Sequence, residues 1–195
     1  MPKVTALRPV RPGRVLVELD GRDWRVVPAE AVARAGLREG LELDRPSLRA
    51  LRRELERARA LEAAGRALRA RELSRRELEE RLERGRIAPA AQAEAIDVLE
   101  RLGLLDEGRF ADDRARALAE RGLGDAAIRS ELERQGIEAE PAEQALAALE
   151  PEAERARRLA VSLGGGVRSV RALRRKGFGE DAIEAAVPSA VAEDG

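Results

Sequence analysis

The 195-residue sequence contains no cysteine and no histidine. Without cysteine the chain can form no disulfide, has no thiol nucleophile and cannot build a zinc finger. Without histidine it lacks the commonest general base and the commonest metal ligand. No glycine-rich phosphate loop ending in Lys followed by Ser or Thr is present either. We therefore expect a protein that is not an enzyme and that uses no cofactor and no metal ion.

Aromatic residues and long hydrophobic runs are also scarce. Trp24, Phe110 and Phe178 are the only aromatics, so stacking of single-stranded bases has little support. Trp24 falls in a strand-like segment, where a Trp is more often a core residue than a partner contact, the alternative that stays open. No segment approaches the length of a membrane span or of a signal peptide, so we expect a cytoplasmic protein that does not enter a membrane.

Charged residues make up 38% of the chain, and 37 basic residues balance 37 acidic ones. Only Lys3 and Lys176 are lysines, which leaves 35 arginines. Codon bias in a GC-rich genome accounts for this preference, yet the guanidinium fork still suits phosphate and carboxylate groups. Because the net charge is zero, we expect only modest non-specific affinity for DNA.

Residues 1–45 differ from the rest of the chain. Val15, Val17 and Leu19 alternate along one strand-like segment, and Asp20-Gly21 separates it from a second one that contains Trp24. Asp-Gly accepts the positive φ angles of a type I′ turn, so this segment predicts a β-hairpin. Residues 4–7 are a candidate third strand, and a short helix near 29–35 is expected to cover the hairpin.

From Pro46 onward the apolar residues follow helical spacing, and one pattern recurs. A helix ends in a turn before Ile87, before Ile137 and before Phe178, and a second helix follows each turn. The intervals between these residues are 50 and 41. Recurrence at this scale indicates one helical unit used repeatedly. Arg86 stands where the other two turns have glycine, which predicts a reshaped first turn.

Each of these units also has a preceding helix, so we expect three-helix modules. Ser74 and Glu77 form a capping-box pattern at one helix start, and Asp125 is expected to cap the corresponding helix of the next unit. The fold class is therefore mainly α, with an N-terminal β-hairpin subdomain followed by tandem three-helix repeats in an elongated, curved arrangement. The expected parts are residues 1–45 (hairpin subdomain), 46–106 (linker helix and first module), 107–150 (second module) and 151–195 (third module and acidic tail).

Two segments resemble the RecX family. Leu102-Gly-Leu-Leu-Asp-Glu-Gly-Arg-Phe-Ala111 is similar to the segment that joins the first two modules of that family, with Asp106 suited to cap a helix and Phe110 to pin it at the joint between the modules. Arg71-Glu-Leu-Ser-Arg-Arg-Glu-Leu78 resembles the family's entrance to its first module. The resemblance implies a monomeric regulator that takes part in recombination, DNA repair and the SOS response, and that binds RecA recombinase filaments on DNA and inhibits ATP turnover, strand exchange or repressor cleavage.

Clusters of basic residues are the candidate contacts with such a filament or with the phosphates of single- or double-stranded DNA. In the third module Arg168, Arg171 and Arg175 share one helical face by their spacing. The full candidate set is Arg75, Arg76, Arg84, Arg86, Arg168, Arg171, Arg174, Arg175 and Lys176. The alternatives are that these charges are only solvated helix faces, that the chain is an autonomous, sequence-independent DNA-binding protein, or that it is a helical-repeat adaptor for another partner.

Overall fold

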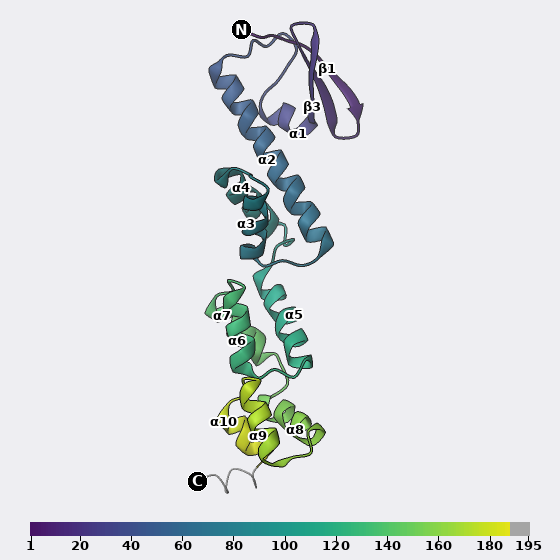
Figure 1. The fold of residues 1–195 in the computed structure, drawn as a ribbon. Helices are drawn as coiled ribbons and strands as arrows, with labels where there is room; N and C mark the ends of the chain where they lie inside the picture. The colour runs from purple at the N-terminus through teal and green to yellow at the C-terminus, as the bar shows by residue number, and fades with distance from the viewer. Residues whose placement is uncertain (188–195) are drawn as a thin grey trace. The chain divides into compact units, whose positions relative to one another are not determined.

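The structure, a computed structural model, describes residues 1–187. A three-stranded sheet precedes a series of helices, so the described chain is mainly helical, as predicted (Figure 1). The elements are β1 (Val4–Arg11), β2 (Arg14–Leu19), β3 (Arg22–Pro28), α1 (Ala29–Arg34), α2 (Arg45–Ala70), α3 (Arg75–Arg84), α4 (Pro89–Arg101), α5 (Glu107–Glu120), α6 (Asp125–Arg134), α7 (Ala139–Ala147), α8 (Glu152–Ser162), α9 (Gly166–Arg175) and α10 (Glu180–Ala186). They form two compact units, residues 1–71 with 78–104, and residues 72–77 with 105 onward. The end of the expected acidic tail, Glu193 and Asp194, lies outside the described residues.

The N-terminal sheet is antiparallel in the order β1-β2-β3, so the third strand that the sequence suggested is present. Asp20 and Gly21 have φ angles of 50° and 75°, the positive values that a type I′ turn requires. Buried Val4, Val17 and Val27 of the sheet pack in one cluster with residues of α1 and α2. Trp24, by contrast, is 43% exposed, so the expectation that it belongs to the core is wrong.

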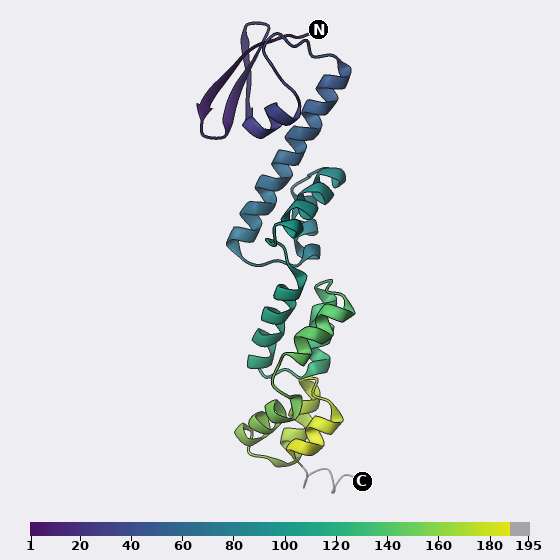
Figure 2. The same ribbon diagram turned by 180° about the vertical axis from the view of Figure 1, so that it is seen from behind.

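Helix α2 begins where its sequence predicts. Asp44 accepts a hydrogen bond from the backbone N–H of Ser47 at 2.8 Å, and Pro46 occupies the first turn, where its missing N–H costs nothing. The first half of α2 packs on α1 and β3, and its second half packs on α4 (Figure 2). This helix therefore packs against both the sheet subdomain and α4 of the first module.

The turn after the middle helix of each module is the same. Ile87, Ile137 and Phe178 are buried, and their N–H groups donate to Leu82, Leu132 and Leu173 at 3.0–3.2 Å. The preceding residues, Arg86, Gly136 and Gly177, have φ angles of 53°, 83° and 79°. This is the Schellman arrangement that closes a helix. Arg86 adopts the left-handed conformation in place of glycine, so the prediction of a reshaped first turn is wrong.

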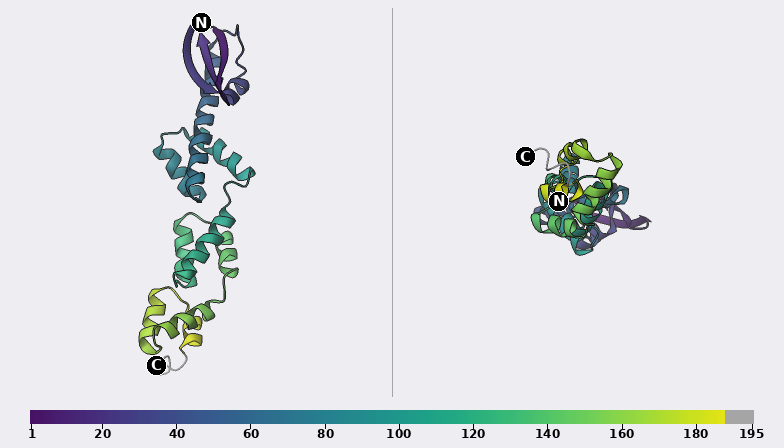
Figure 3. Two further views of the ribbon diagram at one scale, coloured as in Figure 1. Left: turned by 90° about the vertical axis from the view of Figure 1, so that its right-hand side faces the viewer. Right: turned by 90° about the horizontal axis from the view of Figure 1, so that it is seen from below.

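In the second unit, α5–α7 form the second module and α8–α10 the third (Figure 3). Asp106 caps α5 by accepting from the N–H of Arg109 at 2.9 Å, as expected. Phe110 is buried in the core of the second module together with Leu118, Ile128 and Leu132. The core of the third module is built around Leu173, Phe178 and Ile183, with small alanines on α8.

Candidate functional site

The basic face of α9, defined as Arg168, Arg171 and Arg175, is exposed. On the opposite side of the same helix Ser169, Val170 and Leu173 are buried in the core of the third module. Residues three and four apart share a helix face, and the structure gives none of the three arginines an ion-pair or hydrogen-bond partner within residues 1–187. They form a solvent-facing row of guanidinium groups that can meet an anionic partner.

The other two candidates of the third module are engaged in contacts within the unit. Arg174 makes a fork with the carboxylate of Glu180, with both N–O distances at 3.0 Å. The amine of Lys176 donates to the backbone carbonyl of Arg121 at 3.3 Å. These two side chains stabilise the end of α9, and the row of three arginines is the part that stays open to a partner.

The first-module candidates lie at the two ends of α3. Arg75 and Arg76 stand in its first turn, whereas Arg84 donates to the carbonyl of Glu80 at its last turn and Arg86 forms the left-handed turn after it. The middle of α3 separates these pairs. The four arginines therefore do not form one cluster, unlike the row on α9.

Ser74 lies where the start of α3 meets the end of α6, a contact that we call the first joint. Its hydroxyl accepts from the N–H of Glu77 at 3.1 Å while the Glu77 carboxylate accepts from the N–H of Ser74 at 3.4 Å, which completes the predicted capping box. The same hydroxyl, fully buried, donates to the carbonyl of Gln135 at the end of α6 at 2.8 Å. At this first joint Arg76 also covers Gly136, where a Cβ atom would lie 2.9 Å from the Arg76 side chain.

A second joint connects α6 and α9 at the equivalent place in the repeat. The N–H groups of Gly124 and Ala126 donate to the carbonyls of Lys176 and Gly177 at 2.9 and 3.1 Å. Gly124, and not Asp125, is the N-cap of α6, and it makes no side-chain cap, so the expectation for Asp125 is wrong. The N–H groups at the start of α6 are bonded from outside the helix, by these two carbonyls and by the carboxylate of Glu152, which accepts from the N–H of Asp125 at 2.6 Å.

Arg155 of α8 closes this second joint. Its side chain is only 5% exposed, and it donates to the carbonyls of Glu150 and Leu123 at 3.0 and 2.9 Å and to the carboxylate of Asp125. Its guanidinium carbon lies 6.0 Å from the centre of the Phe178 ring. Sequence reasoning missed this residue because nothing in helical spacing separates a buried arginine from an exposed one.

A hollow of about 360 Å³ lies between α5 and α6. Its polar lining is Arg114, Arg121, Ser130, Glu131 and Arg134, and its apolar lining is Leu118, Leu123 and Ala127. Sequence reasoning missed this site too. The available signal was the seven-residue interval between Arg114 and Arg121, which places both on one face of α5.

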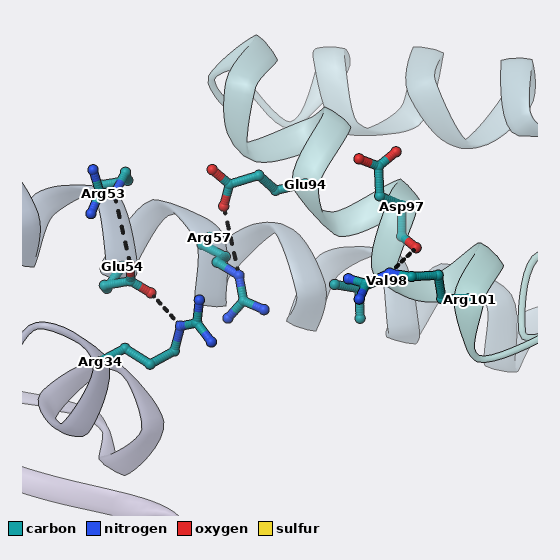
Figure 4. A pocket seen from close by; sticks show the side chains of 8 residues that line it. All are labelled: Arg34, Arg53, Glu54, Arg57, Glu94, Asp97, Val98 and Arg101. Carbon is teal, nitrogen blue, oxygen red and sulfur yellow. Dashed lines mark hydrogen bonds and ion pairs between the residues drawn. The ribbon is translucent and has the colours of Figure 1, made fainter.

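A similar hollow in the first unit is lined by four arginines and three carboxylates, most of them in ion pairs (Figure 4). Glu54 of α2, with a side chain 7% exposed, accepts from Arg34 at 2.9 Å and lies 3.7 Å from Arg53. Arg57 pairs with Glu30 at 3.0 Å and with Glu94 of α4 at 3.6 Å. These ion pairs connect α1, α2 and α4, and their charges compensate one another.

Residues 1–187 contain neither a cluster of metal-ligating side chains nor a membrane-spanning helix. No group of three or more aspartates and glutamates is arranged to hold a metal ion there. In the same part of the chain no helix is both long and apolar enough to cross a membrane.

Comparisons with known proteins agree with this architecture. Residues 106–146 match the family model of the second three-helix domain of RecX. The regulatory protein RecX of Halorhodospira halophila is 34% identical over 143 residues, which cover 68% of this chain and 89% of that protein.

Two solved structures share the fold. A crystal structure of a regulatory protein RecX superposes with a TM-score of 0.83 at 22% identity, covering 95% of this chain and 98% of the other. RecX from Lactobacillus salivarius superposes with a TM-score of 0.61 at 23% identity, covering 70% and 97%. The sequence relationship to the Halorhodospira protein, together with the shared modules, shows that this chain belongs to the RecX family of regulatory proteins.

Proposed function

We propose that this protein binds filaments of a RecA recombinase on DNA and inhibits their activity, acting as a monomer. Membership of a family of regulatory proteins supports a regulatory role. The observation that carries the proposal is the basic face of α9, where three arginines without partners in residues 1–187 stand on one side of a helix whose other side is buried. Such a row suits an acidic protein surface or a phosphate backbone.

The test is the ATPase activity of the cognate recombinase on single-stranded DNA. We expect the protein to inhibit it, and the combined change Arg168→Gln, Arg171→Gln and Arg175→Gln to weaken inhibition several-fold at low salt. Because the three side chains face solvent, each change should alter stability by no more than about 0.5 kcal/mol. The defect should shrink at high salt, where the wild-type contact is already screened.

A matched control removes the same charge elsewhere. Arg22, Arg25 and Arg38 are exposed in the N-terminal part of the chain, and their combined change to Gln should leave inhibition close to wild type. Full inhibition by the folded α9 variant at low salt would contradict the role of this face. Tight, steeply salt-dependent DNA binding with no effect on the recombinase would favour an autonomous DNA-binding protein instead.

A further inference from the structure

The hollow between α5 and α6 carries a surplus of positive charge. Arg114 and Arg121 come from α5 and its C-terminal cap, and Arg134 comes from the last turn of α6. Glu131 is the single carboxylate of the lining. Three guanidinium groups against one carboxylate leave a net charge of +2, compared with +1 for the hollow beside α2, where four arginines face three carboxylates.

Glu131 holds two of these arginines in place. It accepts from Arg114 at 2.6 Å and from Arg134 at 2.7 and 2.8 Å. Burial alone would raise the pKa of Glu131, but hydrogen bonds from Arg114, Arg134 and Gln135 outweigh it and lower the pKa to about 2. The carboxylate therefore stays ionised at neutral pH and orients both guanidinium groups.

One donor in this arrangement is unused. The Nε–H of Arg114 is buried and has no hydrogen-bond acceptor within the described chain, although the Nη2 atom of the same group binds Glu131. A buried N–H without an acceptor is destabilising, and native structures contain few such groups. An oxyanion bound by the more exposed part of the Arg114 guanidinium would change the electrostatic surroundings of this N–H, which makes it a reporter of the hollow.

The rim of the hollow extends the positive charge towards α9. The Arg121 side chain has no hydrogen-bond or ion-pair partner among residues 1–187, and its backbone carbonyl accepts from Lys176. The Lys176 amine also lies 3.6 Å from the position of a Cβ atom on Gly122, at the same corner. A cation from the end of α9 thus lies beside the cations of α5 and α6.

We propose that the α5–α6 hollow binds a phosphate group of a nucleic-acid backbone. A guanidinium fork matches a phosphate geometrically, and a chain of phosphates supplies the successive negative charges that a net charge of +2 with a lysine beside it can neutralise. A single carboxylate from a protein would leave part of this charge uncompensated. The inference rests on the proposed function in one respect, since nucleic acid is the polyanion on which a recombinase filament forms.

The experiment follows the Nε–Hε NMR signal of Arg114 in the full chain, without recombinase. The signal is assigned by its loss in Arg114→Lys, and the protein is titrated with an oligothymidylate at constant ionic strength. We expect a saturable shift of this signal. Arg121→Gln, which breaks no contact within the described chain, should weaken the oligonucleotide affinity about fivefold or more, an effect typical of losing a charged contact.

The control is Arg116→Gln, which removes the same charge from an exposed position of α5 paired only with Asp113. It should change the affinity less than about twofold, as expected for a screened surface charge. Equal losses in both variants, or an Arg114 signal that does not move, would overturn the proposal. A shift with inorganic phosphate or with polyglutamate but not with the oligonucleotide would assign the hollow to a free phosphate or to a protein carboxylate and would also overturn it.

The outcome is independent of the recombinase test. If Arg121→Gln loses affinity for the oligonucleotide and the wild-type protein inhibits the ATPase, both proposals are supported. An Arg114 signal that does not respond, in a protein that still inhibits the recombinase, rejects the hollow and leaves the proposed function standing.

Discussion

The two joints of the second unit occupy equivalent places in the repeat but are built from different groups. At the first, the Ser74 hydroxyl reaches the carbonyl of Gln135, and the Arg76 side chain covers Gly136. At the second, the backbone N–H groups of Gly124 and Ala126 bind carbonyls of Lys176 and Gly177 directly. The same helix ends therefore meet at both joints, but the groups that form the hydrogen bonds differ.

The difference follows from one position of the repeat. Ser74 has a side chain that fills the space between the helix ends, whereas Gly124 has none, and a Cβ atom there would lie 2.3 Å from the backbone nitrogen of Phe178. Without a side chain the backbones approach closely enough to bond. The second joint should accordingly tolerate substitution less well than the first, and four changes test this comparison.

The largest effect is expected for Arg155→Ala, which removes the side chain that closes the second joint. It leaves the carbonyls of Glu150 and Leu123 and the carboxylate of Asp125 without their donor and empties the space of a buried side chain, so the free energy of unfolding should fall by about 3–5 kcal/mol. Chemical denaturation followed by far-ultraviolet circular dichroism measures this loss. Arg158→Ala on the same helix removes only an exposed ion pair with Glu150 and should leave the free energy of unfolding close to that of the wild type. Similar losses in the two variants would show that Arg155 does not close the joint.

The next effect concerns Gly124→Ala, which places a methyl group against the backbone of Gly177 and Phe178. Because backbone must move to make room, we expect a loss of about 2–3 kcal/mol, and faster hydrogen exchange at Ala126. The same substitution at Gly65, in the middle of α2, meets only the end of the Arg69 side chain and should stabilise the chain by up to about 1 kcal/mol. A neutral Gly124→Ala would mean that the second joint is loose.

Ser74→Ala tests the first joint. It removes the helix cap of α3 and the hydrogen bond to Gln135 together, and should cost about 1–2 kcal/mol by denaturation. Ser74→Thr keeps the hydroxyl and serves as the control. Should Ser74→Ala cost more than Gly124→Ala, the order that we assign to the two joints would be reversed.

The smallest effect is expected at Arg86, in the left-handed turn that follows α3, and it is a gain in stability instead of a loss. There the carbonyl of Gly85 accepts from Arg59 of α2 at 3.0 Å. Arg86→Gly should relieve the left-handed backbone and raise the unfolding free energy by about 1 kcal/mol. A loss of stability would indicate that the Arg86 side chain makes a compensating contact.

Local features of this fold were predictable from sequence. Asp20-Gly21 specified the hairpin, Pro46 and Asp106 specified helix starts, and the recurring Ile87 and Ile137 located the module turns, because each depends on residues within a few positions. Arg86 shows the limit of such predictions. The sequence did not reveal that the turn keeps its shape with a non-glycine residue in the left-handed conformation.

The candidate site was predictable only in part. The row on α9 follows from helical spacing, and the structure exposes it. The hollow at Arg114, and the burial of Arg155, depend on residues 17 and 32 positions apart along the chain. Helical periodicity describes one helix at a time, so it cannot say which arginine a neighbouring helix will cover.

The end-to-end joints also bear on cooperativity. A helix of ten residues leaves four N–H and four carbonyl groups unpaired, so α6 by itself is a poor helix. At the joints its first N–H groups are bonded by the end of α9, and one of its last carbonyls by Ser74. In the language of a one-dimensional chain, the stability of each module is the sum of its own core and a coupling to its neighbour. Melting the third module therefore exposes donors of the second, and fraying should spread inward from that end.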